Sequence, residues 1–167
     1  MTPCTLCFWK LYMYQRENKE HTKKTLLLTK KGFTMTKKEI SWATIDELVG
    51  IIARKIHTDS PNIDSIYGIP RGGLIPAVLL SHKLGLPLVQ QPKSNSLVVD
   101  DISDSGNTFL DFIGTLYKPH AYFSGVKTAS LFERQNTAFS PDYVGLHIKY
   151  QDWLVFPWEY EIHAVEN

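Results

Sequence analysis

The chain has 167 residues, of which 43% are hydrophobic and 21% are charged. This length fits one domain, or one domain with an additional arm, and the apolar content is sufficient for a hydrophobic core. The net charge is only +1, which offers no general basis for nucleic-acid binding. No apolar run approaches the roughly 20 residues of a membrane-spanning helix. We therefore expect neither a nucleic-acid nor a membrane partner, and two cysteines indicate a reducing, cytoplasmic compartment.

Residues 1–34 differ in composition from the rest of the chain. They hold both cysteines, Cys4 and Cys7, and their apolar side chains follow no regular period. We expect a poorly ordered arm or leader, with Met35 as the functional start. The two cysteines, with His21 as a third ligand, would make half of a zinc site; two reduced thiols are the simpler interpretation, because no second cysteine pair exists.

From Met35 the pattern predicts a domain over 35–167 in which helices and strands alternate. Thr44-Ile45-Asp46-Glu47 has the form of a capping box, with Thr44 as N-cap. Apolar periodicity predicts helices over about 44–57, 73–84 and 106–117, and strands at 63–69, 86–89, 96–100, 125–132 and 143–148. This alternation indicates an α/β fold whose parallel sheet is flanked by helices.

The first predicted strand-to-helix turn, Ile69-Pro70-Arg71-Gly72-Gly73-Leu74, combines two glycines with an arginine. The glycines let the backbone approach an anion closely, and the N–H groups that open the next helix point to the same place. The guanidinium of Arg71 suits phosphate oxygens. The turn is therefore a candidate phosphate site; a tight turn with a surface arginine is the alternative.

The second turn places Asp100, Asp101 and Asp104 at the end of a buried apolar strand. Carboxylates this close repel one another, which argues against a purely structural role. They would instead accept sugar hydroxyls or hold Mg²⁺. The segment Ser105-Gly106-Asn107-Thr108 then offers N–H groups and hydroxyls at a helix N-terminus, which suit a phosphate. A phosphorylated sugar with Mg²⁺ fits this turn; a helix capped by Asp104 or Ser105 is the alternative.

The segment Val98-Val99-Asp100-Asp101-Ile102-Ser103-Asp104-Ser105-Gly106-Asn107-Thr108 resembles the phosphoribosyl-diphosphate signature of the type I phosphoribosyltransferases. Pro70-Arg71-Gly72-Gly73 stands where that family has its diphosphate loop, and the resemblance covers residues 40–160. Residues 151–159 resemble the purine-binding end of the bacterial and archaeal xanthine, guanine and hypoxanthine enzymes. The resemblance implies a Rossmann-like domain with a small C-terminal hood. It also implies transfer of a phosphoribosyl group to a purine with release of diphosphate, Mg²⁺ as cofactor, and a homodimer.

The resemblance also implies roles for individual residues. Arg71 and Gly72 would hold diphosphate, with a strained or cis peptide near Arg71. Asp100 and Asp101 would bind the ribose hydroxyls, and Asp101 would face Mg²⁺. Asp104 would lie near N7 of the base as the catalytic proton acceptor or donor.

The 5′-phosphate would be held by Ser105, Gly106, Asn107 and Thr108. Trp153 and Leu154 would meet the purine, partly through backbone groups. The family places a lysine near the exocyclic oxygen of the purine. Arg134 is the closest match here, and Lys127 is the other candidate; either one would otherwise be a surface cation.

One departure from the family pattern leaves the activity open. The family carries a long mobile loop before the signature strand, but here the interval 90–96 has only seven residues. Such a short connection cannot close far over the site and exclude water. A partner subunit or the arm would have to provide the cover. The alternatives are a non-catalytic sensor of phosphoribosyl ligands and a transferase acting on another base.

Overall fold

The computed structural model describes residues 36–116, 126–149 and 152–159. Its elements, in chain order, are β1 (Thr36–Glu39), α2 (Trp42–Asp59), β2 (Ser65–Gly68), α3 (Leu74–Leu84), β3 (Ser96–Ser103), α4 (Asn107–Leu116), β4 (Lys127–Arg134), β5 (Tyr143–Ile148) and β6 (Asp152–Val155). The predicted arm, with both cysteines and His21, lies outside these residues. Among the described helices, none combines the length and the apolar character that crossing a membrane requires.

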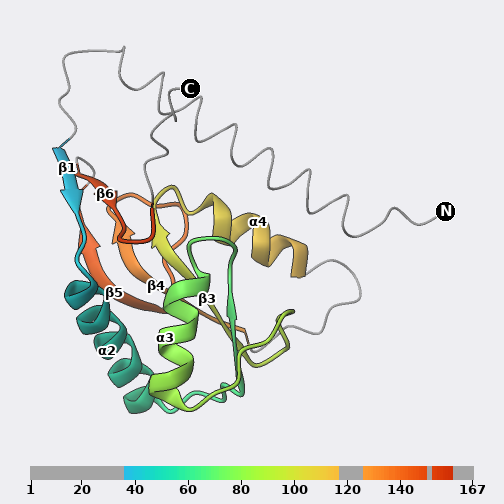
Figure 1. Cartoon of the computed structure of the whole chain (residues 1–167). Coiled ribbons are helices and arrows are strands. Elements are labelled where there is room, and N and C mark those ends of the chain that lie inside the picture. Colours follow the sequence, from blue (N-terminus) through green and yellow to red (C-terminus); the bar gives the residue numbers. More distant parts are fainter. Residues whose placement is uncertain (1–35, 117–125, 150–151, 160–167) are drawn as a thin grey trace, which may run out of the picture. The chain divides into compact units, whose positions relative to one another are not determined.

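The main sheet has four strands in the order β2-β3-β4-β5, and every neighbouring pair is parallel. Figure 1 shows this sheet with helices packed against it. The predicted strand at 86–89 is reduced to one isolated parallel bridge, between Leu88 and Ile66. The expected α/β fold with a parallel sheet is therefore confirmed.

Side chains of the sheet alternate between two cores, because successive residues of a strand point to opposite faces. Ile66 and Val99 belong to the larger core, which also holds the buried face of α2. Tyr67 and Val98 belong to the smaller core, where they pack with Phe109 of α4. The helices thus cover both faces of the sheet, as the right-handed crossovers predict.

Helix α2 begins earlier than predicted, and its N-cap is Ser41 rather than Thr44. Ser41 has the extended backbone of an N-cap (φ −83°, ψ 156°), and its Oγ accepts a hydrogen bond from the Thr44 N–H at 3.1 Å. Thr44 therefore lies inside the first turn of the helix, where a residue cannot cap it. The helix ends at Ser60, whose left-handed backbone (φ 47°) lets its N–H bond the carbonyl of Ile56.

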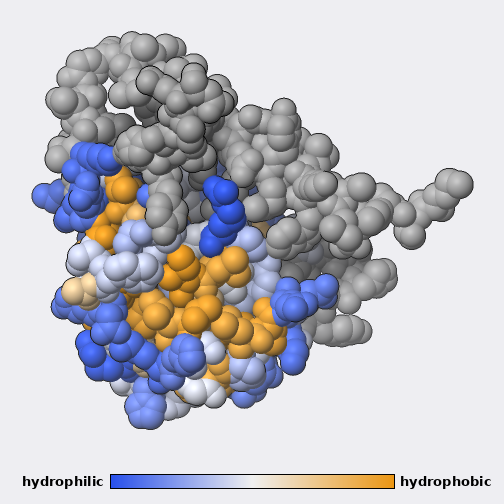
Figure 2. Space-filling view, in the orientation of Figure 1, coloured by the Kyte–Doolittle hydropathy of each residue, from blue (hydrophilic) through white to orange (hydrophobic). Residues whose placement is uncertain are grey.

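Helix α3 is apolar on most of its surface. Ala77 and Leu80 are buried in the larger core, whereas Leu74 and Val78 remain 47% and 41% exposed. Figure 2 shows hydrophobic surface gathered over this helix. Because the apolar character exceeds what one buried face needs, part of it is left on the outside.

A second, two-stranded sheet, which we call the hood, pairs β1 with β6 in parallel, with Lys37 opposite Trp153. The ladder of this small sheet continues one residue past β1, where Ile40 N–H donates to the carbonyl of Val155 at 2.9 Å. Phe156, which follows β6, packs edge-on against Phe132 of β4 and so joins the hood to the main body. Since β6 begins soon after β5 ends, the hood lies near the carboxyl ends of the strands (Figure 1).

Candidate functional site

The turn between β2 and α3 is bound tightly to β3. Ile69 N–H donates to the carbonyl of Val99 at 2.8 Å, and Gly73 N–H donates back to Ile69 at 2.9 Å. A Cβ at Gly73 would overlap the Val99 carbonyl oxygen, so this position accepts only glycine. The Pro70–Arg71 peptide bond is cis, as the resemblance implied, and Arg71 is exposed.

The two predicted turns meet at Gly72 and Asp101. A Cβ at Gly72 would overlap the carboxylate of Asp101, so the backbone of the first turn lies directly against this side chain. Asp101 is 8% exposed, and its Oδ1 accepts a hydrogen bond from the Ile102 N–H at 2.8 Å. The phosphate turn and the acidic strand end thus form one site at the carboxyl edge of the sheet, where ligands of open α/β sheets bind.

The acidic residues occupy different positions relative to β3. The strand was expected to end at Asp100, but it continues to Ser103 because its backbone stays paired with β4, with Asp100 opposite Ser130. Asp100 and Asp101 therefore lie within the strand on opposite faces, both buried. Only Asp104 follows the strand, and its side chain is 57% exposed. The three carboxylates are not a single repelling cluster.

The candidate phosphate cradle opens α4. Gly106 has φ 81°, a left-handed backbone that other residues adopt at a cost, and its carbonyl accepts the Leu110 N–H at 3.1 Å. Ser105 and Asn107 are exposed and Thr108 is half-buried. The first N–H groups of α4 and these polar side chains lie together at the helix N-terminus, which suits an anion.

The turn after β4, residues 135–139, packs against the cradle and is hydrogen-bonded to it. Ala138 N–H donates to the carbonyl of Ser105 at 3.0 Å, and the Ser103 hydroxyl donates to the carbonyl of Phe139 at 2.7 Å. A Cβ at Gly106 would overlap the backbone nitrogen of Phe139. This support could not be predicted from the sequence, since no local pattern links residues so far apart.

The two cations considered for the base lie at opposite ends of β4. Arg134 ends the strand, is 5% exposed, and donates from Nε to Asp104 Oδ1 at 2.6 Å and from Nη1 to the carbonyl of Lys149 at 3.1 Å. It is therefore not a surface cation. Lys127 opens the strand and pairs with Asp142 at 2.9 Å, away from the two turns.

The hood residues also differ from each other. Trp153 is half-buried on β6, whereas Leu154 is 6% exposed and belongs to the larger core. Only backbone groups of Leu154 are therefore available to a ligand. Trp158 stacks on Phe156 with 4.9 Å between ring centroids, which packs the C-terminal part of the hood against the core.

The short connection before β3 is a closed turn, as expected from its length. Lys93 N–H donates a hydrogen bond to the Ser96 hydroxyl at 2.7 Å, and Ser96 N–H donates one to the carbonyl of Lys93 at 3.1 Å. Asn95 accepts a hydrogen bond from the Asp64 N–H before β2. The connection is thereby held at the amino end of the sheet and does not reach the turns at the carboxyl edge.

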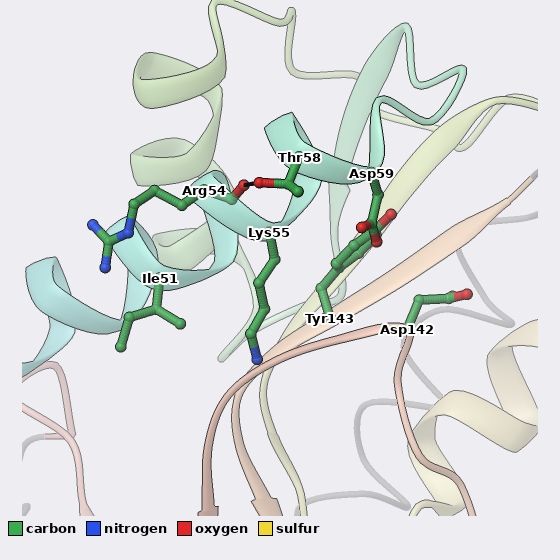
Figure 3. Close-up of a pocket in the computed structure, with 7 residues that line it drawn as sticks. All are labelled: Ile51, Arg54, Lys55, Thr58, Asp59, Asp142 and Tyr143. Carbon is green, nitrogen blue, oxygen red and sulfur yellow. Dashed lines mark hydrogen bonds between the residues drawn. The ribbon is translucent and has the colours of Figure 1, made fainter.

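A cavity of about 460 Å³ lies at that amino end and is shown in Figure 3. It is lined by Ile51, Arg54, Lys55, Thr58, Asp59, Asp142 and Tyr143. Lys55 Nζ donates to the carbonyl of Val144 at 2.7 Å, and burial together with the negative charge of Asp59 raises the pKa of Tyr143. Because these groups interact with one another at the end of the sheet remote from the two turns, the cavity is not the candidate site.

Comparison with known proteins agrees with this geometry, although no family model matches the chain. A xanthine-guanine phosphoribosyltransferase of Cereibacter sphaeroides is 28% identical over 165 residues, which cover 81% of this chain and 92% of that protein. A purine phosphoribosyltransferase structure from Pyrococcus horikoshii is 32% identical with a TM-score of 0.63, covering 78% of this chain and 99% of the other.

The xanthine-guanine-hypoxanthine phosphoribosyltransferase of Helicobacter pylori shares the fold, at 22% identity and a TM-score of 0.59, over 74% of this chain and 93% of the other. The Pyrococcus structure is matched along almost its whole length at more than 30% identity. The two joined turns at the carboxyl edge agree with this match. The chain therefore belongs to the type I phosphoribosyltransferases and is related to the purine phosphoribosyltransferases of that family.

Proposed function

We propose that this protein transfers the 5-phosphoribosyl group from phosphoribosyl diphosphate to hypoxanthine, guanine or xanthine, with release of diphosphate, in the cytoplasm. The observation that carries the proposal is the contact of the Gly72 backbone with the Asp101 carboxylate. It brings an arginine- and glycine-containing turn beside the acidic strand that leads into a phosphate cradle. The names of the relatives support a purine as the acceptor.

The substrate would lie across both turns. Arg71 and Gly72 would hold the diphosphate, because the guanidinium pairs with phosphate oxygens and glycine leaves its N–H accessible. Asp100 and Asp101 would accept the ribose hydroxyls. The 5′-phosphate would sit at the N-terminus of α4, held by Ser105, Gly106, Asn107 and Thr108.

Magnesium fits this arrangement through Asp101, whose carboxylate faces the Gly72 backbone where the diphosphate would lie. Within the described residues, no three acidic, histidine or cysteine side chains lie close enough together to bind one metal ion. Mg²⁺ commonly takes one or two protein carboxylates and completes its shell with substrate oxygens and water, so Asp101 suffices as a protein ligand. When bound, Mg²⁺ stabilises negative charge on the departing diphosphate.

In the reaction the bond between C1′ and the diphosphate oxygen breaks, and a bond from C1′ to a purine nitrogen forms. Positive charge develops on the ribose and negative charge on the diphosphate, where Arg71 and the N–H groups of the turn stabilise it. Asp104 would accept the proton that leaves the base. A positioned general base contributes roughly 10²–10⁴-fold to the rate.

The base would lie between the signature turn and the hood. Trp153 would contact the ring and the backbone of Leu154 would meet its six-membered edge, while Arg134 would lie beside the base, bound to Asp104. For the assembly we propose a homodimer, which the exposed apolar side chains Leu74 and Val78 of α3 support.

The test is diphosphate release from Mg²⁺–phosphoribosyl diphosphate with hypoxanthine, guanine, xanthine, adenine and uracil in separate reactions. We expect release only with the 6-oxopurines. Asp104→Asn should lose at least about 100-fold in kcat while calorimetry shows unchanged binding of phosphoribosyl diphosphate. Asp111→Asn, at an exposed acid on α4, is the matched control and should behave as the wild type.

Two other outcomes would replace the proposal. Release with uracil or adenine alone would make the protein a transferase for another base. Binding of phosphoribosyl diphosphate without release from any base would favour the non-catalytic sensor, with the closed turn at 90–96 as the cause of the lost turnover.

A further inference from the structure

Arg134 joins two segments that lie just beyond the ends of neighbouring strands of the main sheet. Its Nε donates to Asp104 Oδ1 at 2.6 Å, and its Nη1 donates to the carbonyl of Lys149 at 3.1 Å. Asp104 belongs to the loop that follows β3, whereas Lys149 follows the last residue of β5 on the way to β6. Within the sheet, Arg134 is paired in register with Ile148. One side chain therefore links the signature turn to the start of the hood.

The two ends of the Asp104–Arg134 pair differ in exposure and in how they are held. The Arg134 side chain is 6% exposed and is carried by a strand paired on both sides, so its position is well determined. The Asp104 side chain is 57% exposed and lies beyond the strand end. An exposed carboxylate on a loop samples several rotamers, and fixing it costs conformational entropy. A short charge-assisted hydrogen bond from a buried guanidinium offsets that cost.

The geometry also favours arginine over lysine at this position. The planar guanidinium presents several N–H donors in a fixed fork, and here two of them bond an acid on one side and a backbone carbonyl on the other. A lysine ammonium is a compact charge on a flexible side chain, so it would not hold both partners in one fixed arrangement. The departure from the family's lysine thus corresponds to a specific pair of contacts.

We infer that Arg134 is a positioning residue: it orients the Asp104 carboxylate for the proton of the base and anchors the backbone at Lys149, where the chain leaves for the hood. This inference rests on the proposed function and deepens it. It differs from a direct contact between Arg134 and the exocyclic oxygen of the purine, because the effect on catalysis would pass through Asp104.

A double-mutant cycle separates these two roles. Arg134→Met should lower kcat with hypoxanthine by about 10- to 100-fold, since a small misplacement of a catalytic group costs that much, with little change in KM for phosphoribosyl diphosphate. Arg134→Lys should recover only part of the loss. In an Asp104→Asn background, Arg134→Met should lower kcat by less than about 2-fold further, because the group it positions is already gone.

The control is Lys127→Met, which also removes a cation of β4 from an ion pair, but at the remote end of the strand. Its kcat and KM should equal those of the wild type. Equal losses from Arg134→Met in the wild-type and Asp104→Asn backgrounds, together with a raised KM for hypoxanthine, would overturn the inference in favour of direct base contact.

The variant should fold, because removing Arg134 leaves an exposed Asp104 and not a buried unpaired charge. Amide hydrogen exchange provides a readout that needs no activity. Arg134→Met should speed exchange across residues 152–155 by about 10-fold or more, since the anchor at Lys149 is lost, whereas Lys127→Met should not. Unchanged exchange would refute the anchoring role. If the wild type released no diphosphate with any base, the proposed function would instead be refuted.

Discussion

The Gly72 backbone, in the turn after β2, lies directly against the carboxylate of Asp101 in β3. The contact joins two segments that are separated in the sequence by a helix and a closed turn. It also places the phosphate turn directly beside the acidic strand, with no room for a side chain between them. A side chain as small as a methyl group at position 72 would displace the Asp101 carboxylate.

Gly72→Ala should therefore impair both stability and ligand binding. Overpacking at a buried contact costs typically 1–3 kcal/mol, and displacement of Asp101 should weaken binding of Mg²⁺–phosphoribosyl diphosphate by at least about 10-fold. Urea unfolding and isothermal calorimetry measure the two effects. Gly114→Ala is the control: position 114 lies within α4 with no atom near the added Cβ, so the change should stabilise by about 0.5–1 kcal/mol. Wild-type binding by Gly72→Ala would refute the arrangement of the two turns.

Gly106→Ala tests the support that the turn at 135–139 gives the cradle. Position 106 combines a left-handed backbone (φ 81°) with an overlap between the added Cβ and the Phe139 nitrogen. Gly85→Ala has only the first of these, since its φ is 66° and its surroundings are open. We expect a cost of about 1 kcal/mol at position 85, from backbone strain alone, and a clearly larger one at 106. Equal losses in thermal unfolding would show that residues 135–139 do not support the cradle.

Ser41→Ala should destabilise the protein by about 1 kcal/mol, because the alanine cannot accept the hydrogen bond from the Thr44 N–H. Thr44→Ala should cost less, since Thr44 lies within the first turn of α2 and caps nothing. Denaturant unfolding of both variants at one pH gives the comparison. If Thr44→Ala lowered the free energy of unfolding more than Ser41→Ala, Thr44 and not Ser41 would be the N-cap.

The ion pair between Lys127 and Asp142 makes stability depend on pH. Burial alone would raise the pKa of Asp142, but hydrogen bonds from Lys127 and Thr128 outweigh it and hold the pKa below the ordinary 3.8. The hydrogen bond to Asp142 raises the pKa of Lys127 above 10.5. The carboxyl therefore stabilises the fold above its unfolded pKa and loses this as the pH falls through the folded value. The ammonium stabilises below its unfolded pKa and loses this as the pH rises through its raised folded value.

Lys127→Met should thus lower the free energy of unfolding at pH 7 by about 0.2–1 kcal/mol, the range for partly exposed pairs. The difference from the wild type should shrink once the pH falls below 3.8 or rises above 10.5. Unfolding midpoints across pH 2–11 at low ionic strength give the profile. A difference that stays constant over the whole range would show that the charges are not its source.

Several elements were predictable because their signals are local. The apolar residues of β3 and the periodic face of α2 predict a strand and a helix wherever they occur in a chain. The glycines and acids of the two turns likewise indicate an anion site. β1 and β6 were not found, because each has four residues and their parallel pairing joins opposite ends of the described chain. Neither four-residue segment carries a sequence pattern that would indicate its pairing with the other.

The sequence by itself determined the α/β class, the parallel sheet and the chemistry of the two turns, because these depend on residue type and local periodicity. Only the tertiary structure decided that Gly72 meets Asp101, that residues 135–139 support Gly106, and that Arg134 rather than Lys127 reaches the site. These contacts depend on the register between parallel strands. Because register assigns each residue to one end and one face of the sheet, it decides which distant side chains meet.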